Sequence, residues 1–170
     1  MRVRILGLDP GSRRTGYGII EVCGSRNVWV AHGTIEAGEG AMAPRLATIF
    51  GGVSNILREF KPDEAAVEEV FVKLNVGTAL ILGQARGAAV CALALAGVPV
   101  SEYAPARIKQ AVVGHGRAEK SQVQHMVRVM LKLEKIPAAD AADGLACALC
   151  HAHLRARNQL LASALVKSAR

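Results

Sequence analysis

The sequence predicts a single α/β domain in which helices flank a mixed β-sheet. Its 170 residues suffice for one domain with a substantial core. Hydrophobic residues make up 51% of the chain and aromatic residues only 4%, which favours aliphatic strands over an aromatic-rich β-sandwich. Two hairpin-like strands follow the first strand, and helices and strands then alternate, a pattern typical of a mixed sheet.

Hydrophobic periodicity sets the order of the elements. Buried apolar runs predict strands over residues 3–8, 15–22, 27–35, 64–70 and 98–102. Apolar residues at helical spacing predict helices over residues 44–60, 77–96, 105–113, 119–133 and 139–154. Pro10 and Gly11 force a turn after the first strand, and Pro62 breaks the chain before the fourth. We expect residues 1–158 to form the domain and residues 159–170 a frayed C-terminal tail.

Two of the predicted helices have distinctive faces. Residues 77–96 carry almost no charge except Arg86, and a helix that is apolar nearly all round is buried or lies in an interface. The helix over residues 119–133 places on one face Val123, Met126, Val127, Met130 and Leu133, which leaves its basic residues mainly toward solvent.

The net charge of +7 is concentrated toward the C-terminus, since nine basic and four acidic residues follow from Arg117 onward. Clustered positive charge indicates binding to phosphate backbones or to anionic membranes. On charge alone, an ordinary basic cytosolic protein remains an alternative.

The chain shows no secretory signal, and we expect it to be cytoplasmic and without a membrane partner. Its longest apolar run, Ala88–Val100, is judged too short to span a bilayer. The four cysteines are then expected to be reduced. Cys147, Cys150 and His151 match the c-type haem attachment pattern, but they lie inside a predicted helix of a chain without an export signal, and a zinc site would need further ligands.

Four acids stand beside strongly apolar segments far apart in the chain: Asp9, Glu68, Asp140 and Asp143. A lone carboxylate in such surroundings carries a heavy desolvation cost, so these acids need a compensating cation. Mg²⁺ is the natural candidate, because it binds through a few carboxylates together with phosphate oxygens. Acids combined with a basic surface therefore predict metal-dependent chemistry on nucleic acid.

Simpler readings of the acids stay open at this point. Asp9 could cap the turn that follows it. Glu68 and Glu69 point to opposite faces of a strand, so at most one joins Asp9, and both could lie on an exposed edge. Asp140 and Asp143 share one face near a helix N-terminus, where the helix dipole stabilises acids.

Cations and one aromatic residue flank these acids. Lys109 and Lys120 border the glycine-rich stretch VVGHGRAEKS, where they could meet a phosphate backbone or simply be solvated. Arg13 and Arg14 directly follow the Asp9 turn, and we expect both to contact DNA. Phe71 could pack in the core or stack on an unpaired base.

The stretches LGLDPGSRRTGYG, VEEVF, LGQARG, VVGHGRAEKSQVQHMV and ADAADGLA closely resemble the RuvC family of bacterial Holliday-junction resolvases over about residues 3–155. The resemblance implies an RNase H-like fold and a homodimer that nicks a four-way junction symmetrically in homologous recombination and DNA repair. It also implies dependence on Mg²⁺ or Mn²⁺, and the branch-migration proteins RuvA and RuvB as possible partners.

The resemblance also assigns roles to residues of this chain. The family's four catalytic acids fall on Asp9, Glu68 (rather than Glu69), Asp140 and Asp143, which would be the metal ligands. Its supporting lysines fall on Lys109 and Lys120, and its junction-contacting aromatic residue falls on Phe71. The small-residue helix over residues 83–96 looks like the family's dimer interface.

As a hypothesis, hydrolysis uses two ions per subunit, bridged by Asp9 and completed by Glu68 and Asp143, with Asp140 assisting. Lys109 and Lys120 would neutralise the scissile phosphate. One rival is an ATP-binding protein of the actin and sugar-kinase type, whose opening turn is similar but whose chains are much longer. The other is a junction-binding scaffold without catalysis, although all four acids are present.

Overall fold

The fold is a mixed five-stranded sheet, seen in a computed structural model that describes residues 2–70 and 76–168. Three antiparallel strands come first in the chain: β1 (Arg2–Pro10), β2 (Arg14–Cys23) and β3 (Arg26–Glu36). Two parallel strands, β4 (Glu64–Glu68) and β5 (Val100–Tyr103), extend the sheet beyond β1. The strand order is β3-β2-β1-β4-β5, which confirms the predicted mixed sheet.

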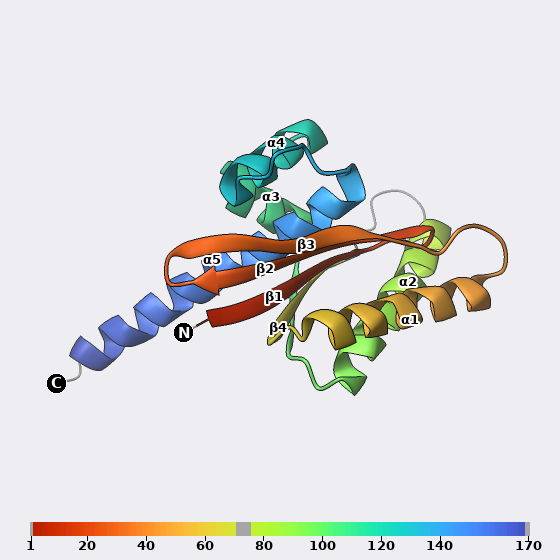
Figure 1. The fold of residues 1–170 in the computed structure, drawn as a ribbon, viewed down its shortest axis with the longest axis horizontal. Helices are drawn as coiled ribbons and strands as arrows, with labels where there is room; N and C mark the ends of the chain where they lie inside the picture. The colour runs from red at the N-terminus through yellow and green to blue at the C-terminus, as the bar shows by residue number, and fades with distance from the viewer. Residues whose placement is uncertain (1, 71–75, 169–170) are drawn as a thin grey trace.

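Helices cover both faces of this sheet (Figure 1). One face carries α1 (Met42–Phe60) and α2 (Val76–Leu95), and the other carries α3 (Pro105–Val113), α4 (Lys120–Leu131) and α5 (Ala139–Ser168). The alternation of side chains along β1 explains the two layers, because Leu6 and Leu8 pack toward α1 and α2 while Val3 and Ile5 pack toward α5.

Glycines bring α5 unusually close to the sheet. A Cβ atom added to Gly144 would lie 2.6 Å from the Cα of Tyr17, and one added to Gly18 would lie 2.5 Å from the Cα of Leu145. No side chain fits in these gaps, since real Cβ atoms do not approach other atoms so closely. The N-terminal turns of α5 therefore rest directly on the backbones of β1 and β2.

Two element boundaries differ from those expected. Strand β4 ends at Glu68 rather than at Val70, although the Glu69 N–H still donates to the Tyr103 carbonyl (2.9 Å). Helix α5 continues to Ser168 rather than ending at Leu154, because the segment after Leu154 is rich in alanine, leucine and other strong helix formers. Helical backbone thus runs into the segment expected to be a frayed tail, and the domain boundary at residue 158 stays a prediction.

The expectation that no apolar run could span a bilayer is wrong for α2. By length and composition, Val76–Leu95 qualifies, with a mean hydropathy of 1.5. The run begins well before Ala88, the start expected from the sequence, and its polar side chains are Thr78, Gln84 and Arg86. In the fold, α2 forms part of a layer, because its buried alanines pack into the core and Arg86 pairs with Glu102 of β5 (2.5 Å).

Candidate active site

The parallel pairing of β1 and β4 places Asp9 and Glu68 side by side. Leu8 pairs with Val67, and the two acids are the next residues along their strands. Both strands are held in this register by fully buried aliphatic residues that precede the acids. Each carboxylate therefore stands at the carboxyl end of a buried strand, the edge at which open α/β sheets bind ligands.

Helix α5 brings the other two acids to the same edge. It begins at Ala139, so Asp140 and Asp143 lie at its N-terminal end. The Asp140 backbone lies directly over Gly16 of β2, and Gly16 pairs with Asp9. The four acids, far apart in sequence, thus meet around the end of β1.

Burial and mutual repulsion raise the pKa values of the two strand acids. The pKa of Asp9 rises to about 6, because burial removes water from its carboxylate and because Asp143 lies nearby. The pKa of Glu68 rises to about 8, first through burial and then through Asp9 and Asp143. At neutral pH Glu68 therefore keeps its proton in the absence of a cation, whereas Asp9 is mainly ionised.

Lysines supply part of the compensation. The Lys120 Nζ atom, at the start of α4, lies 3.3 Å from Asp143 Oδ2. Asp143 in turn raises the pKa of Lys120, which keeps this ammonium charged. Burial still raises the pKa of Asp143, while Lys120 and Lys109 act in the opposite direction. Both predicted lysines thus act electrostatically on the acids, Lys120 by direct contact and Lys109 from α3.

The donor atoms at this edge fit a hard divalent cation. Four carboxylates converge, and Mg²⁺ binds through carboxylate and phosphate oxygens. In residues 2–70 and 76–168, no three Asp, Glu, His or Cys side chains stand close enough to hold an ion as they are. The acids still affect one another, since burial and then Asp9 and Asp143 raise the pKa of Glu68. The acids fit a cation through their oxygen donors and through the uncompensated charge that they bring together.

The predicted DNA-contacting arginines lie beside the acids rather than among them. Arg13 pairs with Glu39 (3.2 Å), and Arg14 lies between Glu36 (3.3 Å) and Asp140 (3.8 Å). Both guanidinium groups are well exposed. They line a cavity of about 550 Å³ that adjoins Asp140, formed by residues 11–14, Glu36, Gly38 and Glu39. An anionic group that enters this cavity would meet both arginines.

The structure describes most of the other residues singled out in the sequence. Phe71 lies outside the described residues. Glu69 is exposed, whereas Glu68 is partly buried beside Asp9. Cys147 and Cys150 are buried on α5, and Cys147 lies close enough to the site that Glu68 and Asp9 add to burial in raising the pKa of its thiol. Both ring nitrogens of His151 have hydrogen-bond partners, Tyr103 Oη (2.7 Å) and Glu64 (2.8 Å).

Two contacts of the site were not predicted from the sequence. Arg45 of α1 donates from Nε to the Ser12 carbonyl (3.0 Å) and so braces the turn between Asp9 and Arg13. Arg14 touches Asp140, which lies at the far end of the sequence. Neither contact follows from local spacing, because each depends on how elements distant in the chain pack together.

Comparison with known proteins identifies the family. The family model described as "Crossover junction endodeoxyribonuclease RuvC" matches residues 5–151. A protein of that name from Burkholderia vietnamiensis is 55% identical over 151 residues, which is 89% of this chain and 84% of the relative. A protein of the same name from Burkholderia thailandensis is 53% identical over the same share of this chain.

Solved structures agree with the sequence matches. "Thermus thermophilus RuvC structure" has a TM-score of 0.82 at 34% identity and covers 91% of this chain and 96% of its own. The complex titled "T. thermophilus RuvC in complex with Holliday junction substrate" has the same TM-score at 36% identity, with 88% and 93% covered. These likenesses confirm the RNase H-like fold. With the match over residues 5–151, they show that the chain belongs to the RuvC family of crossover junction endodeoxyribonucleases.

Proposed function

We propose that this protein is a structure-selective endonuclease that resolves four-way (Holliday) DNA junctions by paired symmetric nicks, in homologous recombination and DNA repair. The observation that carries the proposal is the meeting of Asp9 and Glu68 with Asp143 and Lys120 at one edge of the sheet. A solved relative whose title names a Holliday junction substrate supports the choice of DNA.

The acids suit hydrolysis of a phosphodiester bond. We assign Asp9, Glu68, Asp140 and Asp143 to hold the metal, proposed as two Mg²⁺ per subunit, with Mn²⁺ as a substitute. When bound, such ions supply an activated water and stabilise the leaving oxygen. Lys120 keeps its charge beside Asp143 and would face the scissile phosphate together with Lys109.

Flanking residues would position the DNA. Arg13 and Arg14 present exposed guanidinium groups in the cavity beside Asp140, and these groups suit the phosphates that lead into the site. Phe71 keeps its proposed role as a base-stacking residue. Because Arg14 also touches Asp140, phosphate binding at Arg14 would act directly on the acid cluster.

A homodimer would match the two-fold symmetry of a four-way junction. Support comes from the outer face of α2, where Val76, Leu80 and Leu95 are 71%, 65% and 80% exposed. A soluble protein rarely leaves such an apolar stripe without a partner. This stripe extends the predicted interface over residues 83–96 toward the start of α2. The RuvA and RuvB proteins and a cytoplasmic location fit this function and remain predictions.

Cleavage of a synthetic junction tests the proposal. The purified protein is incubated with a mobile four-way junction or a matched linear duplex, in Mg²⁺ or in EDTA, beside the Asp9→Asn variant. We expect symmetric nicks in the junction alone, only with Mg²⁺, and none with Asp9→Asn, which should still bind the junction. Cleavage of both DNAs at equal rates, or unchanged cleavage by the variant, would contradict the proposal.

A further inference from the structure

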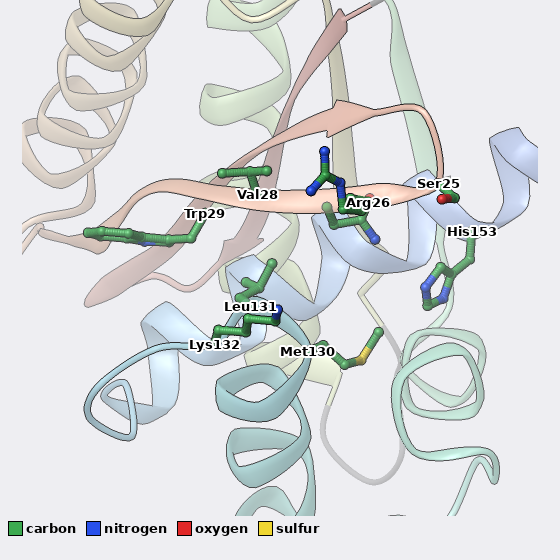
Figure 2. A pocket seen from close by; sticks show the side chains of 9 residues that line it. Ser25, Arg26, Val28, Trp29, Met130, Leu131, Lys132 and His153 are labelled. Carbon is green, nitrogen blue, oxygen red and sulfur yellow. The ribbon is translucent and has the colours of Figure 1, made fainter.

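A surface groove lies between strand β3 and the end of helix α4, and we call it the β3–α4 groove. Its first part is a cavity of about 580 Å³ lined by residues 25–29, residues 130–132 and His153. Its second part, of about 480 Å³, is lined by Trp29, His32 and residues 132–137. Trp29 and Lys132 line both parts, so the two cavities adjoin. Figure 2 shows the first part, with Trp29 on the strand across from Leu131 and Lys132, whereas the Val28 side chain extends from the other side of the strand.

The walls of the groove are apolar and held in place. Val28, Trp29 and Ile136 are 49%, 43% and 56% exposed, although all three are large apolar side chains. The Trp29 indole N–H donates to His32 Nδ1 (2.8 Å), which fixes the ring. Gln124 of α4 donates to the Pro137 carbonyl (3.0 Å) and holds the opposite wall. A partly exposed aromatic anchor in a preformed hollow is typical of protein–protein binding sites.

Cations without partners surround these apolar walls. Arg26, Lys132 and Lys135 line the groove, against a single acid, Glu134. Among the described residues, none of the three cations makes an ion pair, whereas Arg2, Arg4 and Arg155 elsewhere on the surface do. The groove thus offers positive charge to a partner of opposite sign.

The adjoining sheet edge offers backbone hydrogen bonds. Strand β3 is the outermost strand, and within the described residues it pairs with β2 alone. A free strand edge can accept an extended peptide as an added strand. Side-chain pockets beside that edge would then receive alternate residues of the peptide.

The groove lies away from the acids. Trp29 is level with Ile20 and, through it, with Ile5, which precedes Asp9 by four residues. That separation is roughly 13 Å along the strand, and the groove lies two strands further toward the sheet edge. A ligand in the first part of the groove would therefore leave the candidate active site open, whereas the second part ends at Pro137, three residues before Asp140.

We propose that the β3–α4 groove is a docking site for an acidic, extended peptide segment of a partner protein, in which apolar residues alternate with aspartate or glutamate. The apolar residues would contact Trp29 and Ile136, and the carboxylates would pair with Arg26, Lys132 and Lys135. Nucleic acid is the less suitable occupant, because a phosphate backbone would leave the apolar walls without contacts.

The single tryptophan of the chain makes a direct test possible, because all tryptophan fluorescence comes from Trp29. The full-length protein is titrated with blocked peptides that alternate leucine, phenylalanine or valine with glutamate, with the same peptides carrying lysine, and with oligothymidine. Arg26→Glu and Lys135→Glu each reverse one cation of the groove. Lys132 is left unchanged, because its backbone is left-handed (φ 53°). Arg58→Glu, on the exposed side of α1, is the matched control.

We expect a saturable change in Trp29 emission with a glutamate peptide only. Arg26→Glu and Lys135→Glu should each weaken it by about fivefold or more, and Arg58→Glu should not. All three variants should nick a junction at the parental rate, which shows that they are folded. Equal binding of a lysine peptide or of oligothymidine would overturn the proposal. So would a complete lack of response to the glutamate peptides, or equal affinity in the groove variants and the parent.

Discussion

Glu68 occupies a position in which its ionised form is unfavourable. Its carboxylate ends a buried strand beside Asp9, and burial together with that neighbour raises its pKa to about 8. A side chain that only stabilised the fold would gain nothing from such a position. A cation bound between the acids would relieve the repulsion, so the folded protein is less stable without a cation than with one.

Replacement of Glu68 by glutamine should stabilise the metal-free protein at high pH while abolishing nicking. The pKa of Glu68 is raised from 4.5 to about 8. Between these values the folded chain keeps a proton that the unfolded chain has lost, so stability falls as the pH rises through this window. Glutamine removes that fall. We expect the variant to be more stable than the parent by about 1 kcal/mol or more at pH ~8, and equal to it at pH ~4.5.

Thermal unfolding in EDTA at several pH values measures this difference. Glu69→Gln is the matched control, because Glu69 is the exposed neighbour and its replacement should change neither stability nor nicking. A Glu68→Gln variant that is less stable than the parent at every pH would show that the carboxylate is structural.

For single residues, the sequence identified the candidate site acids but did not predict most of their contacts. Asp9 and Glu68 stand out because each ends a buried strand, yet alternation alone left Glu68 and Glu69 equivalent. The structure separates them by the parallel register of β4 with β1. The bridge from Arg14 to Asp140 could not be read from the chain, because it depends on how α5 packs over β2.

Among the elements, α5 is the one whose position depends most on close packing against the sheet. It delivers Asp140 and Asp143 to Asp9 only because glycines let it rest on the backbones of β1 and β2. The same helix buries Cys147 and Cys150, and its His151 forms a hydrogen bond with Glu64 of β4. The C-A-L-C-H sequence therefore serves packing in the described structure, and the position of the two acids depends on helix–sheet distance.

Gly144→Ala should push α5 away from β2 and disable the site. The added methyl group would lie 2.6 Å from Tyr17 backbone atoms, which cannot move aside as a flexible side chain could. We expect a loss of about 1–3 kcal/mol in the free energy of unfolding, together with a large loss of nicking, measured by denaturant unfolding and junction cleavage. Gly51→Ala in α1 is the control, since its methyl group meets nothing within 4 Å and should stabilise the helix by about 0.5–1 kcal/mol. Unchanged nicking by folded Gly144→Ala would refute the close-packing account.

The outer stripe of α2 supports a prediction about assembly. Leu80 is 65% exposed on a helix whose opposite face packs on α1 and the sheet. Leu80→Glu would place a charge in the proposed dimer interface and should weaken dimerisation by about tenfold or more, as measured by analytical ultracentrifugation. Val129→Glu, at an exposed apolar position on α4, should leave the mass unchanged. A parental dimer in the Leu80→Glu variant would place the interface elsewhere.

Sequence periodicity predicted the elements well where packing and propensity agree. The amphipathic α1 and the aliphatic strands of the sheet are examples. It was less accurate at element ends, because the pairing of β4 stops where β5 stops and helical propensity carries α5 beyond Leu154. Nor did it show which faces of α2 are covered, since a helix that is apolar all round has no preferred side in its sequence.

In the whole molecule, separate surfaces serve separate tasks. The acids and the arginine-lined cavity lie at one end of the strands, the apolar stripe lies on the outer face of α2, and the β3–α4 groove lies along the edge strand β3. DNA, a second subunit and a peptide could therefore be bound at the same time. All four acids come from one chain, so the proposed dimer would carry two complete sets.

A mixed dimer tests whether paired nicks need two such sets. One subunit carries Asp9→Asn and a distinct affinity tag, and the mixed dimer is purified through both tags. Because each active site lies within one subunit, the mixed dimer should nick one strand of a cruciform plasmid and leave the opposite strand intact. The product should be nicked circles, whereas the parental dimer should yield linear plasmid, and gel electrophoresis separates the two. Linear product at the parental rate would show that one active subunit cuts both strands, and the two-fold model of resolution would be wrong.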